Sequence, residues 1–408
     1  MIYLSEGINK DSTNVLIIGK SGVGKSSLLN YMFGRELQKV GVGAPVTKME
    51  VKKFVYKYDD HFEMHIYDTW GLEPSAQKAE EWKNTIFKEI ERHDAEKISD
   101  WFNTIIFCMN SKSARVEDFE IDIMEELLRE KNHVTIALTH CNSKSDPDGI
   151  VLRESVKEEL AKRGVEPPDD RNFVFVSNVR KKLLGGTVEQ FGKEEIFISI
   201  IRNVWASLKS KVPYQTRRKF ENSFALKKAE LLKKPDSLKW IVPFMRKNRI
   251  KVLEREINKN CDAFVNELVS EINEMYSDAV EYYTAISRKY AMIGFQMDAE
   301  DYRTSAVIHF DAMHTIRQQV NADLELLTKR ILFFDDAFNN TELRVKLRDS
   351  IINFRILMRD GKKIREDLRR ELERYMDSVY RYLDEHLKRI EKSLESLEIE
   401  DLYMFQTT

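Results

Sequence analysis

The segment Val15–Leu29 reads V-L-I-I-G-K-S-G-V-G-K-S-S-L-L. An apolar run, typical of a buried strand, meets a glycine-rich turn that opens directly into an apolar-periodic helix. Gly19, Gly24, Lys25 and Ser26 fit the spacing G-x-x-x-x-G-K-[ST]. Such a turn aims backbone N–H groups at phosphate oxygens, and the positive end of the following helix adds to the same field. The segment therefore predicts a phosphate-binding loop.

Within this loop, Lys25 is expected to reach the β and γ phosphates, and the Ser26 hydroxyl is expected to bind Mg²⁺. The loop and the first helical turn together supply the expected nucleotide-binding residues. These are Gly19, Ser21, Gly22, Val23, Gly24, Lys25, Ser26 and Ser27.

Length, charge and cysteine content narrow the class of protein. The 408 residues predict about two or three domains. Charged residues make up 33% of the chain, yet the net charge is only -2, so partners must be sought at local patches. Three cysteines without a C-x-x-C pair favour a reducing compartment. The N-terminus has no basic start followed by an apolar core, and no apolar run approaches the roughly 20 residues that span a bilayer. A cytoplasmic protein is expected.

Glycine and proline divide the chain into two parts. Thirteen of the 15 glycines lie at or before Gly192, and all eight prolines lie at or before Pro243. We therefore expect an α/β domain over residues 1–210 and an all-helical domain over residues 211–408.

In the first part, apolar runs alternate with helical patterns, which predicts a mainly parallel sheet. Only Asp59, Asp60 and His61 separate the second run from the third, so these two strands should form an antiparallel hairpin and make the sheet mixed. Six strands are predicted, at 14–19, 49–58, 62–67, 104–109, 133–139 and 173–176. Five helices are predicted, at 25–33, 76–96, 116–130, 150–163 and 189–208.

Two further segments follow the phosphate loop in an informative order. Asp68-Thr-Trp-Gly71 comes after the third strand; its aspartate can hold a Mg²⁺ water, and its glycine has an N–H to offer a γ-phosphate. Between the first helix and the second strand, a loop of small residues ends in Pro45-Val46-Thr47. Thr47 is expected to close over the nucleotide as the second hydroxyl ligand of Mg²⁺.

With these motifs, residues 9–210 resemble an Era-like GTP-binding domain of the translation-factor-related class of P-loop GTPases. The resemblance implies a six-stranded mixed sheet, bound GTP or GDP with Mg²⁺, and two switch loops that order around the γ-phosphate. It assigns Thr47 to the first switch, and Asp68 and Gly71 to the second. Lys25, Thr47 and Gly71 are then the expected catalytic residues, and Ser26, Thr47 and Asp68 the expected metal ligands.

The base-reading motif of this class, N-K-x-D or T-K-x-D, departs from its pattern here. The fifth predicted strand ends at Thr139, and His140-Cys141-Asn142 follow it. Thr139, His140, Asn142, Ser177 and Asn178 are the residues expected to bind the base side of the nucleotide. An asparagine offers one acceptor oxygen and brings a competing NH₂ donor, whereas the family aspartate accepts from both guanine N1–H and the 2-amino group. The alternative alignment, which needs an insertion, makes Asp146 the base reader. After the sixth strand, Ser177-Asn178 stands where the family has Ser-Ala.

The predicted catalytic machinery also lacks one group. Many small GTPases have a glutamine directly after D-x-x-G to orient the attacking water, and this chain has Leu72. A leucine makes no hydrogen bond. Hydrolysis is therefore expected to be slow unless another group in the chain, a partner or a second protomer of a homodimer supplies the missing contact.

The second part of the chain reads as long amphipathic helices. Apolar residues recur at steps of three and four in four runs, which predicts helices that pack as an elongated antiparallel bundle. The runs extend over residues 253–290, 306–331, 343–358 and 364–397.

The segment Leu208–Val252 has unusual charge, with 14 lysines or arginines against three acidic residues. Inside it lies the apolar cluster Trp240–Met245. Three uses remain open: attachment to an anionic membrane surface, binding of nucleic acid phosphates, or a solvated helix face whose apolar side is buried. The nucleic acid reading is the least favoured.

The function expected from the sequence is a GTP-hydrolysing switch whose nucleotide state passes to the C-terminal helical bundle. In outline only, a G domain followed by long helices is similar to dynamin-like GTPases, which suggests work at a membrane surface. A non-hydrolysing, nucleotide-dependent scaffold is the alternative.

Overall fold

The computed structural model describes residues 12–33, 38–39, 51–57, 63–69, 76–113, 115–183, 186–237, 259–261, 263–279, 281–283, 285–286 and 361–395. They fall into two compact units. The N-terminal unit comprises Met1–Lys211, Glu281–Asn321 and Glu398–Thr408, and the helical unit comprises Val212–Val280 and Ala322–Leu397. The N-terminal unit therefore includes segments from the second half of the sequence.

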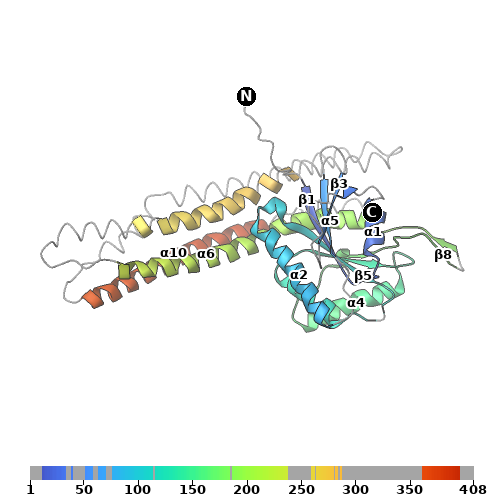
Figure 1. The fold of residues 1–408 in the computed structure, drawn as a ribbon, viewed down its shortest axis with the longest axis horizontal. Helices are drawn as coiled ribbons and strands as arrows, with labels where there is room; N and C mark the ends of the chain where they lie inside the picture. The colour runs from blue at the N-terminus through green and yellow to red at the C-terminus, as the bar shows by residue number, and fades with distance from the viewer. Residues whose placement is uncertain are drawn as a thin grey trace, which may run out of the picture. The chain divides into compact units, whose positions relative to one another are not determined.

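A mixed sheet forms the centre of the N-terminal unit (Figure 1). Its strand order is β2-β3-β4-β1-β5-β6-β7. The strands are β1 Ser12–Ile18, β2 Gln38–Lys39, β3 Lys52–Lys57, β4 Glu63–Asp68, β5 Phe102–Asn110, β6 Val134–Thr139 and β7 Phe173–Phe175. The six predicted strands are all present, and the two-residue β2 extends the edge beside β3.

Strand pairing confirms the predicted hairpin. β3 pairs with β4 in antiparallel register, whereas β1 pairs in parallel with both β4 and β5. β5, β6 and β7 continue the parallel part. Because β1 is central, it is buried along its whole length, and its carboxyl end delivers the phosphate loop to the middle of the sheet edge.

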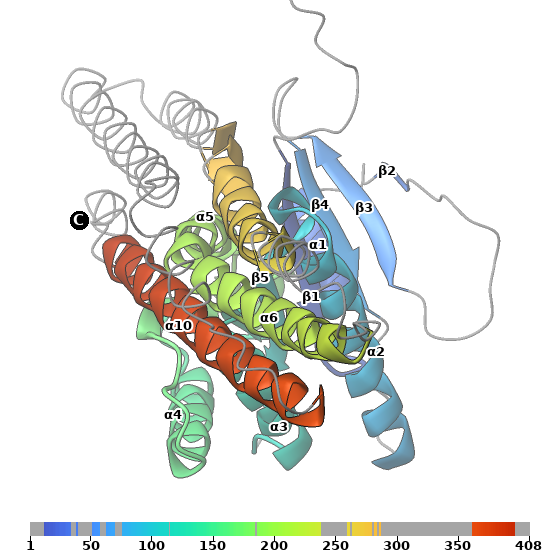
Figure 2. The same cartoon turned by 90° about the vertical axis from the view of Figure 1, so that its left-hand side faces the viewer.

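Helices cover both faces of this sheet (Figure 2). One face packs its apolar side chains against α2 Ala76–Ala95, α3 Asp118–Arg129 and α4 Pro147–Lys162 in a single buried cluster. α1 Lys25–Phe33 and α5 Lys193–Lys209 lie together on the other face, where the rings of Phe33 and Phe197 meet with centroids 5.7 Å apart. Parallel strands buried on both sides explain why the predicted strands read as continuous apolar runs.

One predicted helix begins too early. The sequence suggested a helix over residues 189–208, but α5 starts at Lys193 after Gly192 in the left-handed conformation. Residues before it form a small hairpin of β8 Lys181–Leu183 and β9 Gly186–Val188, and Phe191 bridges to Ser177. Gly192 fits because an added Cβ would lie 2.5 Å from the Phe175 carbonyl oxygen.

Residues 281–286 belong to the N-terminal unit although they lie far along the chain. The Tyr282 hydroxyl lies 3.0 Å from Asn103 Oδ1 and 3.3 Å from the Ser12 carbonyl oxygen. Tyr283 is fully buried, with its ring centroid 5.7 Å from that of Trp205. This segment therefore completes the core near the start of β1 and β5.

Three helical segments are described in the helical unit: α6 Lys211–Ser237, whose first residue belongs to the N-terminal unit, residues 259–279, and α10 Gly361–Glu395. α6 and α10 lie side by side and antiparallel (Figures 1 and 2), since Arg217 pairs with Glu391 while Lys228 pairs with Asp377. The apolar stripes predicted on residues 259–279 and on α10 are buried. The predicted runs 306–331 and 343–358 lie outside the described residues.

No helix in the described part of the chain is both long and apolar enough to cross a membrane.

Candidate functional site

The loop between β1 and α1 has the backbone that its glycines predict. Gly19, Gly22 and Gly24 have φ of 145°, 80° and 92°, conformations that other residues rarely adopt. Gly19 also approaches β5 closely, because an added Cβ would lie 2.5 Å from the Cys108 carbonyl oxygen. Ser21, Ser26 and Ser27 are exposed, whereas Val23 is buried. The hydroxyls are thus accessible to a ligand at this loop.

Lys25 is folded back over the loop. Its ammonium donates to the carbonyl oxygens of Gly19 and Lys20, each at 2.8 Å, and its side chain is largely buried. Burial lowers the pKa of Lys25, and the negative charge of Asp68 opposes that effect. The two carbonyl oxygens hold the Lys25 ammonium at the loop, where the oxygens of a bound phosphate would compete with them for its hydrogen bonds.

Asp68 lies at the carboxyl end of β4, opposite Ile17 of β1. Its Oδ1 is buried and has no hydrogen-bond partner among the described residues. Burial raises the pKa of Asp68, while Lys25 and Lys52 oppose the rise. A buried carboxylate oxygen with unused acceptor capacity, next to the phosphate loop, suits the water shell of a magnesium ion. Thr47 and Gly71, the other predicted switch residues, lie outside the described residues, as does Leu72.

The end of β6 is tied directly to the phosphate loop. Thr139 Oγ1 lies 2.5 Å from the Val23 carbonyl oxygen and 3.0 Å from that of Met109. His140 follows with φ of 61°, and an added Cβ on Gly24 would lie 3.5 Å from its Nε2. The predicted nucleotide-binding residues Thr139 and His140 are therefore brought to the phosphate loop.

Asn142 and Asp146, the two candidate base readers, differ in accessibility. Asn142 is exposed, two residues beyond His140. Asp146 is buried at the N-terminus of α4, and its carboxylate accepts from the backbone N–H of Asn142 at 2.7 Å and of Asp148 at 3.1 Å. The direct alignment, without an insertion, thus leaves a free side chain at the position of the family aspartate.

The segment after β7 also reaches the phosphate loop. Asn178 Nδ2 donates to the Gly24 carbonyl oxygen at 3.1 Å. Ser177 is buried and pairs through its backbone with Phe191, and Gln190 donates to the Asn178 carbonyl oxygen at 2.8 Å. The structure thus gathers all the predicted sites that it describes at one sheet edge.

Sequence reasoning missed two contacts of the phosphate loop. Lys20 forms ion pairs with Glu117 at 2.5 Å and Glu120 at 3.1 Å, which tie the loop to the start of α3. Cys108 lies beneath Gly19, and burial raises the pKa of its thiol to about 12. Lys20 occupies a variable position of the loop motif, and its partners Glu117 and Glu120, like Cys108, lie about 90 to 100 residues further along the chain, so only the fold reveals these contacts.

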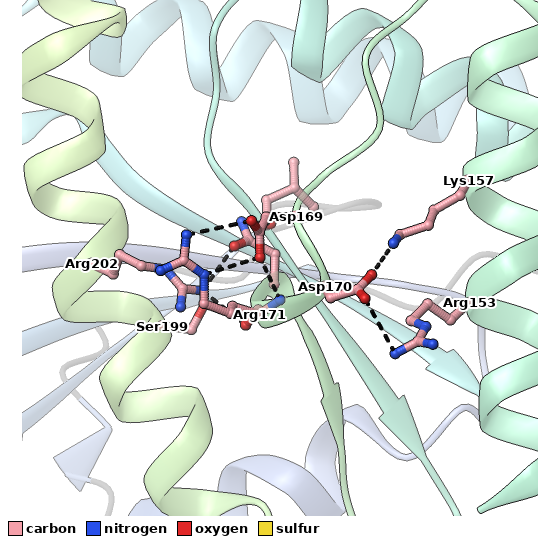
Figure 3. A network of polar contacts seen from close by, with 9 residues as sticks. Arg153, Lys157, Asp169, Asp170, Arg171, Ser199 and Arg202 are labelled. Carbon is pink, nitrogen blue, oxygen red and sulfur yellow. Dashed lines mark hydrogen bonds and ion pairs between the residues drawn. The ribbon is translucent and has the colours of Figure 1, made fainter. Parts of the chain in front are cut away.

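A cavity of about 760 Å³ lies at the opposite edge, between the amino ends of β6 and β7 and the second half of α5. Figure 3 shows a network of polar contacts at this edge that includes the lining residues Asp169, Arg171 and Arg202. Arg202 donates to the Arg171 carbonyl oxygen and to Asn172 Oδ1, each at 2.8 Å, and Arg171 holds Asp169 at 3.0 Å. That hydrogen bond lowers the pKa of Asp169. Asp170 pairs with Lys157 instead.

At the same edge, His133 Nε2 lies 2.9 Å from Ser210 Oγ. Burial lowers the pKa of His133 to about 4, and the charge of Lys211 adds to the effect. The histidine is therefore neutral at pH 7 and acts as a packed polar group. The internal pairing around this cavity assigns it to the structure of the domain, away from the nucleotide site.

Comparison with known proteins agrees with the geometry. Residues 14–140 match the model of the 50S ribosome-binding GTPase family. No curated protein matches the chain.

Solved structures similar to the chain include three G-domain proteins. The G domain of the T. maritima FeoB iron transporter has 17% identity and a TM-score of 0.30, over 47% of this chain and 98% of that one. Aquifex aeolicus Era bound to GDP and AlF4⁻ has 18% identity and a TM-score of 0.28, over 43% and 52%. The FeoB G domain of Methanococcus jannaschii has 16% identity and a TM-score of 0.28, over 48% and 98%.

The family match covers the phosphate loop, Asp68 and β6 up to His140, the same elements that the structure brings together. Residues 14–140 are therefore similar to a family of GTPases, and the N-terminal unit has the mixed sheet and flanking helices of a P-loop GTPase fold.

Proposed function

We propose that this protein is a slow GTPase switch that binds GTP or GDP with Mg²⁺ at the β1–α1 loop and passes its nucleotide state to the C-terminal helices. The observation that carries the proposal is the buried ammonium of Lys25 together with the buried Oδ1 of Asp68 at the loop. Lys25 is held by two replaceable carbonyls, and Asp68 Oδ1 has no partner among the described residues. Both would gain contacts from a magnesium-bound triphosphate.

Three residues are proposed to hold the metal: the hydroxyls of Ser26 and Thr47, and Asp68 through water. Magnesium supplies positive charge that neutralises the β and γ phosphates during transfer. Lys25 would exchange its contacts with Gly19 and Lys20 for phosphate oxygens. The Gly71 N–H would donate to the γ-phosphate, a hydrogen bond that forms with GTP and not with GDP.

Hydrolysis breaks the bond between the γ-phosphorus and the β–γ bridging oxygen as water attacks in line, giving GDP and inorganic phosphate. Lys25 stabilises the charge that develops on the leaving oxygen. Because Leu72 cannot orient the water, we propose that turnover is slow in the isolated chain. A second protomer facing the nucleotide would supply the missing contact.

For the base, we propose that Asn142 faces the edge of the purine that carries the 2-substituent, with His140 packed along the ring and Ser177 and Asn178 behind it. Calorimetric binding of GTP, GDP, ATP and xanthosine triphosphate to the purified chain tests the assignment. We expect GTP and GDP to bind more tightly than ATP. Equal or tighter binding of ATP would reject the guanine assignment.

A nucleotide-dependent scaffold without hydrolysis is the second candidate, and Leu72 is the observation that favours it. Multiple-turnover phosphate release separates the two functions. Release above that of a Lys25→Ala control, measured over a range of protein concentrations, supports the switch. Binding without any release supports the scaffold.

An anionic membrane surface is the proposed further partner of the segment Leu208–Val252. Several cations of this segment have partners within the protein, which argues against a lipid-facing α6: Lys227 pairs with Glu267, Lys228 with Asp377 and Lys211 with Asp94. The proposal therefore rests on Trp240–Met245 and its neighbouring cations, which lie outside the described residues. Co-sedimentation with acidic liposomes that is lost on Trp240→Glu and weakens with salt would support it; no binding to any liposome would remove it.

A further inference from the structure

The carboxylate of Asp146 is unusually well occupied. Lys112, in the loop after β5, places its ammonium 3.0 Å from Oδ1 and 2.9 Å from Oδ2. The Asn142 N–H donates to Oδ2 at 2.7 Å, and the Asp148 N–H donates to Oδ1 at 3.1 Å. A carboxylate has about four lone-pair sites, and the backbone and Lys112 contacts use that capacity.

This occupancy bears on which residue reads the base. A base reader must accept hydrogen bonds from two guanine N–H groups, so it needs free oxygen lone pairs at an accessible surface. The oxygen lone pairs of Asp146 are used by these contacts, and its side chain is only 2% exposed. Asn142 has an exposed side chain, and its backbone is fixed by Asp146.

The Asp146 carboxylate, held by Lys112 and by the backbone N–H of Asn142, is called the clamp below. Both of its charged groups are ionised. Burial opposes ionisation of Asp146, but the Asn142 N–H and the Lys112 ammonium outweigh it, so the pKa of Asp146 is lowered. Burial also opposes the charge of Lys112, and its hydrogen bonds to Asp148 and Asp146 outweigh that effect and raise its pKa. The clamp is therefore charged on both sides near neutral pH, and it links the loops that follow β5 and β6.

We propose that Asp146, held by Lys112, is a positioning residue that sets the orientation of Asn142 toward the purine base. The inference rests on the proposed nucleotide function, since it concerns how the same site selects a base. Lys112 and Asp146 do not touch the nucleotide. They act through the backbone of Asn142, and so they determine selectivity for the 2-substituent of the purine.

The test compares three ligands by calorimetry with the full chain and Mg²⁺: GTP, xanthosine triphosphate and inorganic tripolyphosphate. Tripolyphosphate reports the phosphate loop without a base. Asp146→Asn keeps the shape of the side chain but replaces one acceptor oxygen with a donor. Lys112→Met removes the cation from the same clamp, and Lys112→Arg restores it. Asp148→Asn is the matched control. It removes the charge of the exposed Asp148 carboxylate, which also binds Lys112 at 2.8 Å, but it keeps the backbone N–H of residue 148 that donates to Asp146.

We expect Asp146→Asn and Lys112→Met each to weaken both nucleoside triphosphates by about tenfold, the effect of a lost buried, charge-assisted hydrogen bond. The ratio of GTP to xanthosine triphosphate affinity should move toward one. Tripolyphosphate affinity should stay within about twofold, as should all three affinities in Asp148→Asn and Lys112→Arg.

Two results would overturn the inference. An equal loss for all three ligands in Asp146→Asn and Lys112→Met would mean that the clamp only stabilises the fold. Loss of GTP binding with xanthosine triphosphate binding kept or gained in Asp146→Asn would mean that Asp146 itself reads the base. The proposed function fails separately, if the unaltered chain binds neither nucleotide better than tripolyphosphate.

Discussion

The ammonium nitrogen of Lys211 lies 2.8 Å from Asp94 Oδ1 inside the N-terminal unit. Lys211 is fully buried, donates to Asn132 Oδ1 at 2.8 Å, and lies over the ring of Trp101 with 5.6 Å to its centroid. A buried charge keeps its place only while its partner remains, because water cannot replace that partner.

Lys211→Met should therefore leave a buried carboxylate without its cation and lower the free energy of unfolding by about 3–5 kcal/mol. Urea denaturation followed by tryptophan fluorescence measures the loss. The double variant Lys211→Met/Asp94→Asn should recover part of it, since no uncompensated charge remains. A single variant as stable as the unaltered protein would show that Asp94 does not depend on Lys211.

Lys25→Ala should lower triphosphate affinity by at least about tenfold, because a phosphate in the loop would lose its direct cation. Calorimetric titration with GTP checks this, with Lys162→Ala, which removes an exposed lysine of α4, as a control that leaves the phosphate loop unchanged. Unchanged affinity would remove the phosphate-loop assignment.

Hydrolysis by the isolated protein should be slow, on the order of 10⁻³ s⁻¹, as for unassisted switch GTPases. Phosphate release per protein molecule should rise with protein concentration if a second protomer supplies the contact that Leu72 cannot make. A fast rate that is independent of concentration would reveal a catalytic group within one chain.

Asn142→Asp should tighten GTP and loosen xanthosine triphosphate, each by about tenfold. The asparagine NH₂ faces the guanine 2-amino donor but can donate to the xanthine 2-carbonyl, and a donor that faces a donor costs about 1–3 kcal/mol. Competition binding with both nucleotides measures the change in the ratio of GTP affinity to xanthosine triphosphate affinity. If Asn142→Asp leaves both affinities unchanged, Asn142 does not contact the base.

His133 should make the protein less stable in mild acid. Its folded pKa of about 4 lies below the ordinary value of 6.5, so between these values the unfolded chain binds more protons. Stability is then lost as the pH falls from about 6.5 to about 4, by about 3 kcal/mol. Urea unfolding at several pH values should show a shallower dependence for His133→Gln than for the unaltered protein. Equal slopes would contradict a histidine that is neutral in the folded protein.

Local patterns were enough to predict the phosphate loop, α1 and the β3–β4 hairpin. Their signals lie within a few residues: the glycine spacing, the apolar periodicity of the helix and the short connection between two apolar runs. The sequence also predicted that Asp68 lies at the end of a strand, and the structure places it at the end of β4 beside β1; its role as a metal ligand stays a prediction.

Contacts between distant segments could not be predicted in the same way. Asn178 meets Gly24 across 154 positions, and a sequence pattern carries no information on such a pairing. The β8–β9 hairpin was missed because each strand has only three residues, too few to show a period of two. The sequence of Leu208–Val252 shows its positive charge but not which acidic residues pair with it. The acidic partners of Lys227 and Lys228 lie about 40 and 150 residues further along the chain.

The burial of Tyr282, Tyr283 and Ile286 in the N-terminal unit has a practical consequence for expression of that unit by itself. A fragment that stops at the end of α5 would carry the complete phosphate loop but would expose the ring of Trp205, and Asn103 would lose its tyrosine donor. Such a fragment would be prone to aggregate, because apolar surface meant for the core would face water. Limited proteolysis of the whole chain should therefore yield a soluble core that retains a noncovalently bound peptide from the second half.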